Sequence, residues 1–164
     1  MKPQRWLPPA LCLALPLAGM AWACPELRLD DEYRLQACVR EGVRLGLFRS
    51  AHDTAEGGLL VAALESAFAA STGCQLMLGR GGLRLDSLLF GESASRVVVS
   101  VSPDGEAALK ALCETHRVPF AKIGVTGGTR FALAVDGVAV MDADAADLRA
   151  IHEGTLPAAL EHEG

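Results

Sequence analysis

The sequence has few aromatic residues and very little lysine. Aromatics make up 5% of its 164 residues, so a packed core must rest on Val, Leu and Ala rather than on large rings. Lysine occurs only at positions 2, 110 and 122, the net charge is −5, and no basic stripe is present. Because nucleic-acid binding depends on clustered Lys and Arg, this composition argues against a nucleic-acid partner.

The cysteines lack the spacing of a metal or redox motif. They are widely and irregularly placed, at Cys12, Cys24, Cys38, Cys74 and Cys113, with no C-x-x-C pair. Zinc-binding and thioredoxin-like sites are therefore not supported, and we expect no metal site. Cys38 and Cys113 fall on the apolar faces of expected helices, where a free thiol packs as a small apolar side chain, so we expect reduced core cysteines.

The first 24 residues form a segment of different character. Two basic residues precede an apolar stretch from Trp6 to Ala23, which ends in Ala-Trp-Ala directly before Cys24. A basic start, an apolar middle and an A-x-A end outline a secretory signal. The stretch is short for a bilayer span and contains three prolines, which argues against a membrane-spanning helix. The alternative is linker sequence translated from a displaced start in a longer gene.

The rest of the chain indicates one domain, residues 25–160, followed by a short tail, residues 161–164. Helices are expected over residues 31–47, 58–71 and 144–152 and from Ser102-Pro103 onward, and strands over residues 74–78, 96–102, 118–125, 130–135 and 138–141. Residues 83–89 fit either a helical turn or an extended piece. Strands and helices alternate, with one hairpin, so we predict a single layered α/β (α+β) domain with a mixed β-sheet covered by helices.

Two further expectations concern how this sheet is packed. In residues 96–102, Val97, Val99 and Val101 alternate with Val98 and Ser100, and Val98 makes both faces partly apolar, which suits a central strand. We expect the helices, including residues 58–71, to cover one face of the sheet. Gly42, inside the first helix, costs stability there, and close approach to another element would explain it.

The segment 50–59 reads Ser-Ala-His-Asp-Thr-Ala-Glu-Gly-Gly-Leu and precedes a buried helix. Gly57 and Gly58 would let backbone N–H groups approach a ligand, and a helix N-terminus attracts phosphate. The acidic residues of the segment would repel phosphate unless a metal ion intervened. The structural alternative is that Asp53 or Thr54 caps the helix and the glycines shape the turn.

Two other segments have residues that a ligand site could use. The segment 89–96, Leu-Phe-Gly-Glu-Ser-Ala-Ser-Arg, leads into the valine strand and offers a local ion pair and a hydroxyl. The segment 123–128, Ile-Gly-Val-Thr-Gly-Gly, lacks the Lys and the following helix of a P-loop, so it is interpreted as a turn between strands.

The segments 50–59 and 89–96, in this order, resemble phosphoribosylformylglycinamidine synthase. The resemblance lies in Ser-Ala-His-Asp-x-x-Glu-Gly-Gly-Leu before an Ala-rich helix and in Leu-Phe-Gly-Glu-Ser-x-Ser-Arg-Val running into a Val/Ser strand. It covers about Pro25 to Leu160 and is similar to the second C-terminal domain of that enzyme. It implies the fold of the C-terminal domain of aminoimidazole ribonucleotide synthase-related proteins.

The resemblance also implies a function, which belongs to the complete enzyme. That enzyme uses ATP to activate a formylglycinamide oxygen, which ammonia from glutamine then replaces. Its ATP-binding domains supply the catalytic His and the magnesium carboxylates, and neither those motifs nor a glutaminase segment occurs here. We therefore expect no catalytic residue and no cofactor in this chain, with ATP and magnesium acting at the level of the family. The expected partner is the ATP-binding domain or the remaining part of the synthase.

The expected location is the cytoplasm, where the substrates of such an enzyme are found. The alternative function is an exported, non-enzymatic binding or structural domain, in one version anchored by a lipid at Cys24.

The resemblance implies residues that contact a ligand, but only some of them have a matching residue in this sequence. In the catalytic half of such enzymes a Glu-Ser-Gln segment touches the substrate. Here the corresponding residues are Glu92-Ser93-Ala94, where Ala replaces the amide, as in what resembles the auxiliary copy. The candidates for contact with a ligand or a partner domain are His52, Asp53, Gly57, Gly58, Glu92, Ser93 and Arg96. We expect the two segments to meet at a shared edge of the domain.

Overall fold

The computed structural model describes residues 11–14 and 28–161. The elements in chain order are β1 (Leu11–Ala14), α1 (Leu29–Arg44), β2 (Phe48–Asp53), α2 (Gly58–Ala69), β3 (Cys74–Leu78), α3 (Leu85–Phe90), β4 (Val97–Val101), the 3-10 turn η1 (Pro103–Gly105), α4 (Glu106–His116), β5 (Ala121–Thr126), β6 (Arg130–Val135), β7 (Val138–Asp144) and α5 (Ala145–Glu161). The prediction of a mixed α/β domain is confirmed, and the ambiguous residues 83–89 contribute to a short helix, α3.

The strands described form one mixed sheet in the order β2-β4-β1-β5-β3-β6-β7. β3 and β6 run parallel, and all other neighbours are antiparallel. The predicted hairpin at Asp136-Gly137 joins β6 to β7, with both turn residues at positive φ. β4 lies between β2 and β1, so its prediction as an internal strand is confirmed.

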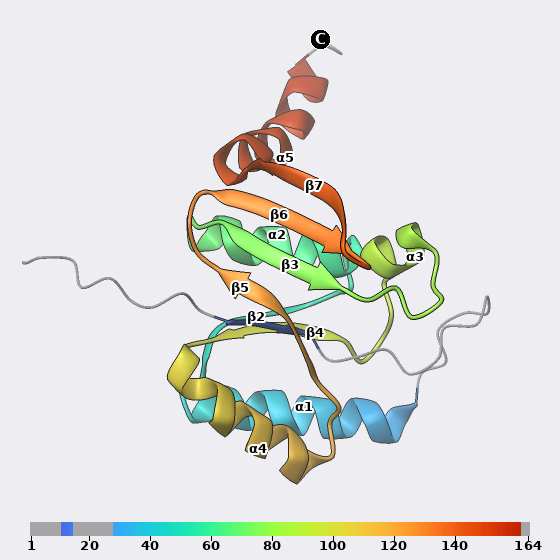
Figure 1. Ribbon diagram of the computed structural model, residues 1–164, viewed down its shortest axis with the longest axis vertical. Coiled ribbons are helices and arrows are strands. Elements are labelled where there is room, and N and C mark those ends of the chain that lie inside the picture. Colours follow the sequence, from blue (N-terminus) through green and yellow to red (C-terminus); the bar gives the residue numbers. More distant parts are fainter. Residues whose placement is uncertain (1–10, 15–27, 162–164) are drawn as a thin grey trace, which may run out of the picture.

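Helices lie on both faces of the sheet, which corrects the expectation that they cover one face. Val98 packs in a core cluster with α2 and with strands β3 and β6. Val99 and Val101 pack in a second cluster with α1 and α4. Because successive side chains of a strand point to opposite faces, the valine run serves two cores. Figure 1 shows α1 and α4 side by side below β2 and β4, and α2 behind β3 and β6.

Helix α1 confirms one prediction and corrects another. An added Cβ at Gly42 would stand 2.3 Å from Cζ of Phe48, so the glycine allows the helix to lie directly on that ring. The helix begins at Leu29, earlier than expected, and its N-cap position is Arg28, without a side-chain cap bond. Asp30 and Asp31 lie inside the first turn, so neither of them caps the helix.

The ends of the chain bear on the predicted domain limits. The boundary between residues 24 and 25 lies outside the described residues, as does most of the tail at 161–164. Within the signal-like segment, Leu11–Ala14 forms a strand of the same sheet as the rest of the domain. In the described part of the chain, no helix is long and apolar enough to cross a membrane.

Candidate functional site

The two predicted segments meet at one end of helix α2. The backbone N–H of Gly57 donates to Oε1 of Glu92 at 2.8 Å. The hydroxyl of Thr54 donates to the carbonyl of Ser93 at 3.3 Å, and both of these residues are buried. Segments 35 to 40 residues apart in sequence are thus joined by one charged and one neutral hydrogen bond.

Two glycines at this contact avoid steric overlap. Gly57 and Gly58 both have φ of +73°, a left-handed conformation that other residues rarely adopt. A Cβ at Gly58 would lie 2.5 Å from the backbone carbon of Phe90, and one at Gly57 would lie 2.5 Å from the side chain of Val61. Gly58 therefore lets the two segments approach each other, whereas Gly57 leaves room for Val61 within α2. Whether they also admit a ligand stays a prediction.

The N-terminus of α2 is not capped by Asp53 or Thr54, contrary to the structural alternative for this segment. The N-cap residue is Gly57, with no side-chain cap bond from within the helix, and the first turn contains no acidic residue. Asp53 instead accepts from the N–H of Ala55, and Thr54 faces the second segment, so the expectation that either caps α2 is wrong. Glu92 brings its carboxylate to the positive end of the helix from the other loop.

His52 lies on β2 and is directed toward α2 rather than toward Glu92. Its Nε2 is 2.8 Å from Oε2 of Glu65, and its Nδ1 is 2.7 Å from the carbonyl oxygen of Asp53. Both ring nitrogens therefore face acceptors. The other oxygen of Glu65 is 3.3 Å from Nε2 of His152 on α5. His52 thus belongs to a cluster that joins three elements, and it is not part of the contact between the two loops.

Arg96 is the least expected member of the set because it is buried without an anionic partner. Its side chain is 5% exposed, and Nη1 donates to the carbonyl of Gly91 at 3.4 Å. Nε is buried with no hydrogen-bond partner, and no ion pair to Arg96 occurs among the described residues. Burial lowers the pKa of this guanidinium. A buried cation held only by neutral groups is a natural contact for an anion.

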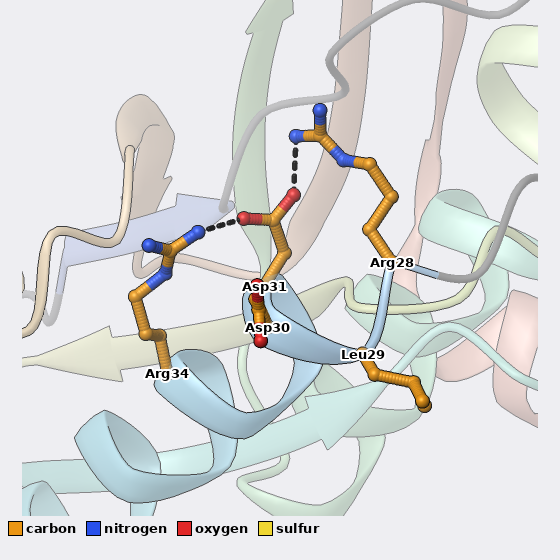
Figure 2. A pocket seen from close by; sticks show the side chains of 5 residues that line it. All are labelled: Arg28, Leu29, Asp30, Asp31 and Arg34. Atoms are coloured by element: carbon orange, nitrogen blue, oxygen red, sulfur yellow. Dashed lines mark hydrogen bonds and ion pairs between the residues drawn. The ribbon is translucent and has the colours of Figure 1, made fainter.

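The start of α1 closes one side of the second loop. Ser95 donates its hydroxyl to Oε2 of Glu32 at 2.5 Å. In the same part of α1, a shallow pocket is lined by Arg28, Leu29, Asp30, Asp31 and Arg34, shown in Figure 2. Both carboxylate oxygens of Asp31 are engaged, one by Arg34 and one by Arg28. These arginines hold the pKa of Asp31 below its usual value, with the hydrogen bond from Arg34 as the largest cause.

The structure thus groups five of the seven predicted residues and separates two. Gly57, Gly58, Glu92, Ser93 and Arg96 belong to the joined loops. His52 and exposed Asp53 lie at the end of β2 on opposite faces. Sequence reasoning missed Thr54, which is 1% exposed, and Glu65 as a partner of His52. In the described part of the chain, no group of three His, Cys, Asp or Glu side chains could hold a metal ion.

Comparison with protein families identifies the family of this chain. The family described as AIR synthase related protein, C-terminal domain, matches residues 21–136.

Curated relatives carry the name phosphoribosylformylglycinamidine synthase subunit PurL. The protein of Thermomicrobium roseum is 47% identical over 116 residues, which cover 68% of this chain and 16% of the relative. The protein of Thermobifida fusca is 38% identical over 154 residues, which cover 88% of this chain and 20% of the relative. The chain therefore spans about a fifth or less of the length of these relatives.

Solved structures share the fold. Thermotoga maritima PurL complexed with ATP superimposes with a TM-score of 0.73 at 19% identity, covering 84% of this chain and 25% of the other. The hydrogenase maturation protein HypE in complex with ATP gives a TM-score of 0.61 at 13% identity. Identities this low show a common fold and nothing further.

Proposed function

Because this chain belongs to the family of AIR synthase related protein C-terminal domains, we propose that it is the C-terminal module of a phosphoribosylformylglycinamidine synthase. The observation that carries the proposal is the 47% identity over 116 residues to a PurL subunit. The two contacting loops agree with it, because the segments that carry the resemblance are the ones that meet at the N-terminus of α2. In this role the chain serves purine biosynthesis as part of an ATP-dependent ligase.

The module does not carry out the amidation alone. The catalytic His and magnesium carboxylates of such enzymes belong to the ATP-binding domains, and the chain spans only 16% of its relative from Thermomicrobium roseum. Among the described residues, no cluster of metal ligands is present that could hold magnesium. ATP and magnesium are cofactors of the complete synthase, and the module works in the cytoplasm with it.

The joined loops are the surface that we assign to the ATP-binding partner domain. Glu92 is exposed and charged, and it is held in place by the N–H of Gly57. Buried Arg96 donates to the carbonyl of Gly91 in the same loop and has an unsatisfied Nε. A fixed carboxylate and a buried cation in one loop offer a partner domain, or a ligand held between the domains, one group of each sign. The loops are already bonded to each other, so little ordering is needed when the partner binds.

The test uses Thermobifida fusca PurL from which the stretch matched by this chain has been deleted. We expect the deleted enzyme and the purified chain to be inactive separately with ATP, ammonia and formylglycinamide ribonucleotide. Mixed, they should form a complex on size exclusion and recover turnover. Glu92→Gln should weaken the complex, and Glu153→Gln, a matched change on exposed α5, should not. Turnover by the chain alone, or a folded chain that neither binds nor restores activity, would refute the proposal.

A further inference from the structure

The strand β1 connects two halves of the sheet that share no other ladder in the described part of the chain. It runs antiparallel to β4, with Leu11 opposite Val101 and Ala14 opposite Val98. It also runs antiparallel to β5 on its other side, with Leu11 opposite Val125. β2 and β4 lie on one side of β1, and β5, β3, β6 and β7 on the other.

Without this strand, two inner edges of the sheet would lose their partners. The edge of β4 carries Val98, Val99 and Val101, whose side chains are at most 3% exposed beneath helices on both faces. Without β1, the backbone N–H and C=O groups on this edge would lose their ladder partners, and backbone groups within a folded core are almost always paired. An unpaired, β-branched edge also invites pairing with other chains.

The sequence of the segment suits a short internal strand. Leu-Cys-Leu-Ala is apolar throughout, as expected for a strand with covered faces on both sides. Pro9 and Pro16 stand on either side of it in the sequence. Because proline has no N–H to donate to a ladder, a strand here is limited to a few residues between them.

We propose that Leu11–Ala14 is a permanent strand of the folded domain, filling the slot between β4 and β5. This proposal does not depend on the proposed function. The same residues lie in the apolar part of the signal-like segment, and cleavage before Cys24 would remove them. The two roles exclude each other, because a chain that folds as described keeps residues 11–14 in its sheet.

The slot has other conceivable occupants, which the test distinguishes. A second copy of the chain could donate the strand, or the slot could stay empty while core packing, such as that of Val98 in one cluster with β3 and β6, holds the halves together. In the structure the chain's own residues occupy the slot. Leu11 to Ala14 pair with β4 and, with an irregularity between Cys12 and Leu13, with β5.

Hydrogen exchange measured by mass spectrometry on the full chain tests the proposal directly. Peptides from residues 11–14, β4 and β5 should all be protected. Leu13→Pro removes an N–H from the strand, since Leu13 is opposite Val99 on one side and Lys122 on the other. It should speed exchange in β4 and β5 by about tenfold or more. Leu7→Pro, the same change outside β1 and next to an existing proline, should leave them as they are.

Three results would overturn the proposal. Residues 11–14 could exchange as fast as a free peptide while β4 and β5 stay protected. The folded protein isolated from its producing cells could begin at Cys24 by intact mass. Sedimentation could show a dimer that Leu13→Pro dissociates, which would identify a second copy as the occupant. If Leu13→Pro unfolds the whole chain and Leu7→Pro does not, the protection of residues 11–14 in the unaltered chain still decides the question.

Discussion

At Gly58, the backbone of one loop touches the backbone of the other. The residue is buried at the first position of α2, has a positive φ, and has no room for a Cβ beside Phe90. Flexible side chains can yield to a new atom, but the backbones of two helix ends, the start of α2 and the end of α3, cannot do so without moving apart. The contact between the two segments therefore depends on this glycine as much as on its hydrogen bonds.

Replacing Gly58 with Ala should destabilise the domain. The left-handed backbone and the overlap with Phe90 together should cost about 2–4 kcal/mol of unfolding free energy, measured by urea titration. Gly154→Ala is the matched control, because Gly154 lies on exposed α5 with nothing within 4 Å of an added Cβ. That change should be neutral or stabilise by up to about 1 kcal/mol. Equal effects of the two substitutions would contradict the steric account.

Cys38 and Cys113 form a thiol pair that the sequence did not indicate. Both are buried and free, on α1 and α4. Their sulfur atoms are in hydrogen-bonding contact, and donation from Cys113 lowers the pKa of Cys38 to about 7 although burial opposes this. The same hydrogen bond and burial raise the pKa of Cys113. The two thiols are 75 residues apart in sequence and lie together because α1 and α4 pack on the same face of the sheet.

The pair predicts a pH titration with a defined sign. As the pH rises from 6 to 8, thiolate absorbance at 240 nm should increase by one cysteine in the native chain, because Cys38 ionises with a pKa of about 7. Cys113→Ala removes the donor and should move this step to higher pH, since burial then dominates. Cys113→Ser keeps a donor and should shift it less. A native titration with no step below pH 8 would contradict the assignment.

At the scale of elements, Glu65 of α2 joins a strand to the last helix. One carboxylate oxygen meets His52 of β2, and the other meets His152 of α5. The ring of His152 also lies 5.7 Å from that of Phe68, and Arg149 donates to the carbonyl of Phe68 at 3.2 Å. The first half of α5 is thus attached to α2 by several polar contacts. Glu65 of α2 contacts both of the other elements, β2 and α5.

Glu65→Ala should loosen α5 more than it destabilises the domain. The three side chains are about a third to a half exposed, so the loss should be only about 1 kcal/mol in urea unfolding. Hydrogen exchange in α5 should become faster. Glu153→Ala removes a single exposed i,i+4 pair with Arg149 and should cost less than about 0.5 kcal/mol. Unchanged exchange in α5 after Glu65→Ala would show that the cluster does not hold the helix.

Local patterns predicted the elements better than their ends. The alternation at 96–102 identified β4, and Asp136-Gly137 identified the hairpin, because both signals depend only on neighbours in sequence. The caps were predicted wrongly for the opposite reason. α2 takes its anion from Glu92, 35 residues beyond Gly57, and no pattern within the first turn could indicate that. The pairing of the two cysteines escaped prediction in the same way.

At the scale of the molecule, the sheet order and the two-sided cover were beyond the sequence. The alternation of strands and helices indicated a layered fold, but not that β1 would separate β4 from β5. Leu11–Ala14 is apolar in a way that fits a signal and a strand equally well. For the candidate site, the resemblance of the two segments to one family predicted that they meet. The orientation of His52 toward Glu65 could not be predicted in this way, because it depends on the pairing of His52 with Val98 across β2 and β4.

The extent of the domain at its C-terminal end provides the last prediction. The family match ends at residue 136, yet β7 pairs along β6, and Met141 and Leu148 pack on the core beneath α2. Beyond residue 149 the side chains of α5 are exposed, including Leu156 and Leu160. The stable unit should therefore end near residue 153, between the family limit and the predicted limit at 160.

Thermal unfolding of two truncated chains tests this extent. A chain ending at Glu153 keeps the contacts of Arg149 and His152 with α2, so its Tm should differ by less than about 2 °C from that of the full chain. A chain ending at Asp144 loses the packing of Leu148 together with those polar contacts, and should lose at least about 2 kcal/mol. If the chain ending at Asp144 were as stable as the full chain, α5 would not belong to the domain. If the chain ending at Glu153 were the one destabilised, the exposed half of α5 would have to contribute contacts that its side chains do not make here.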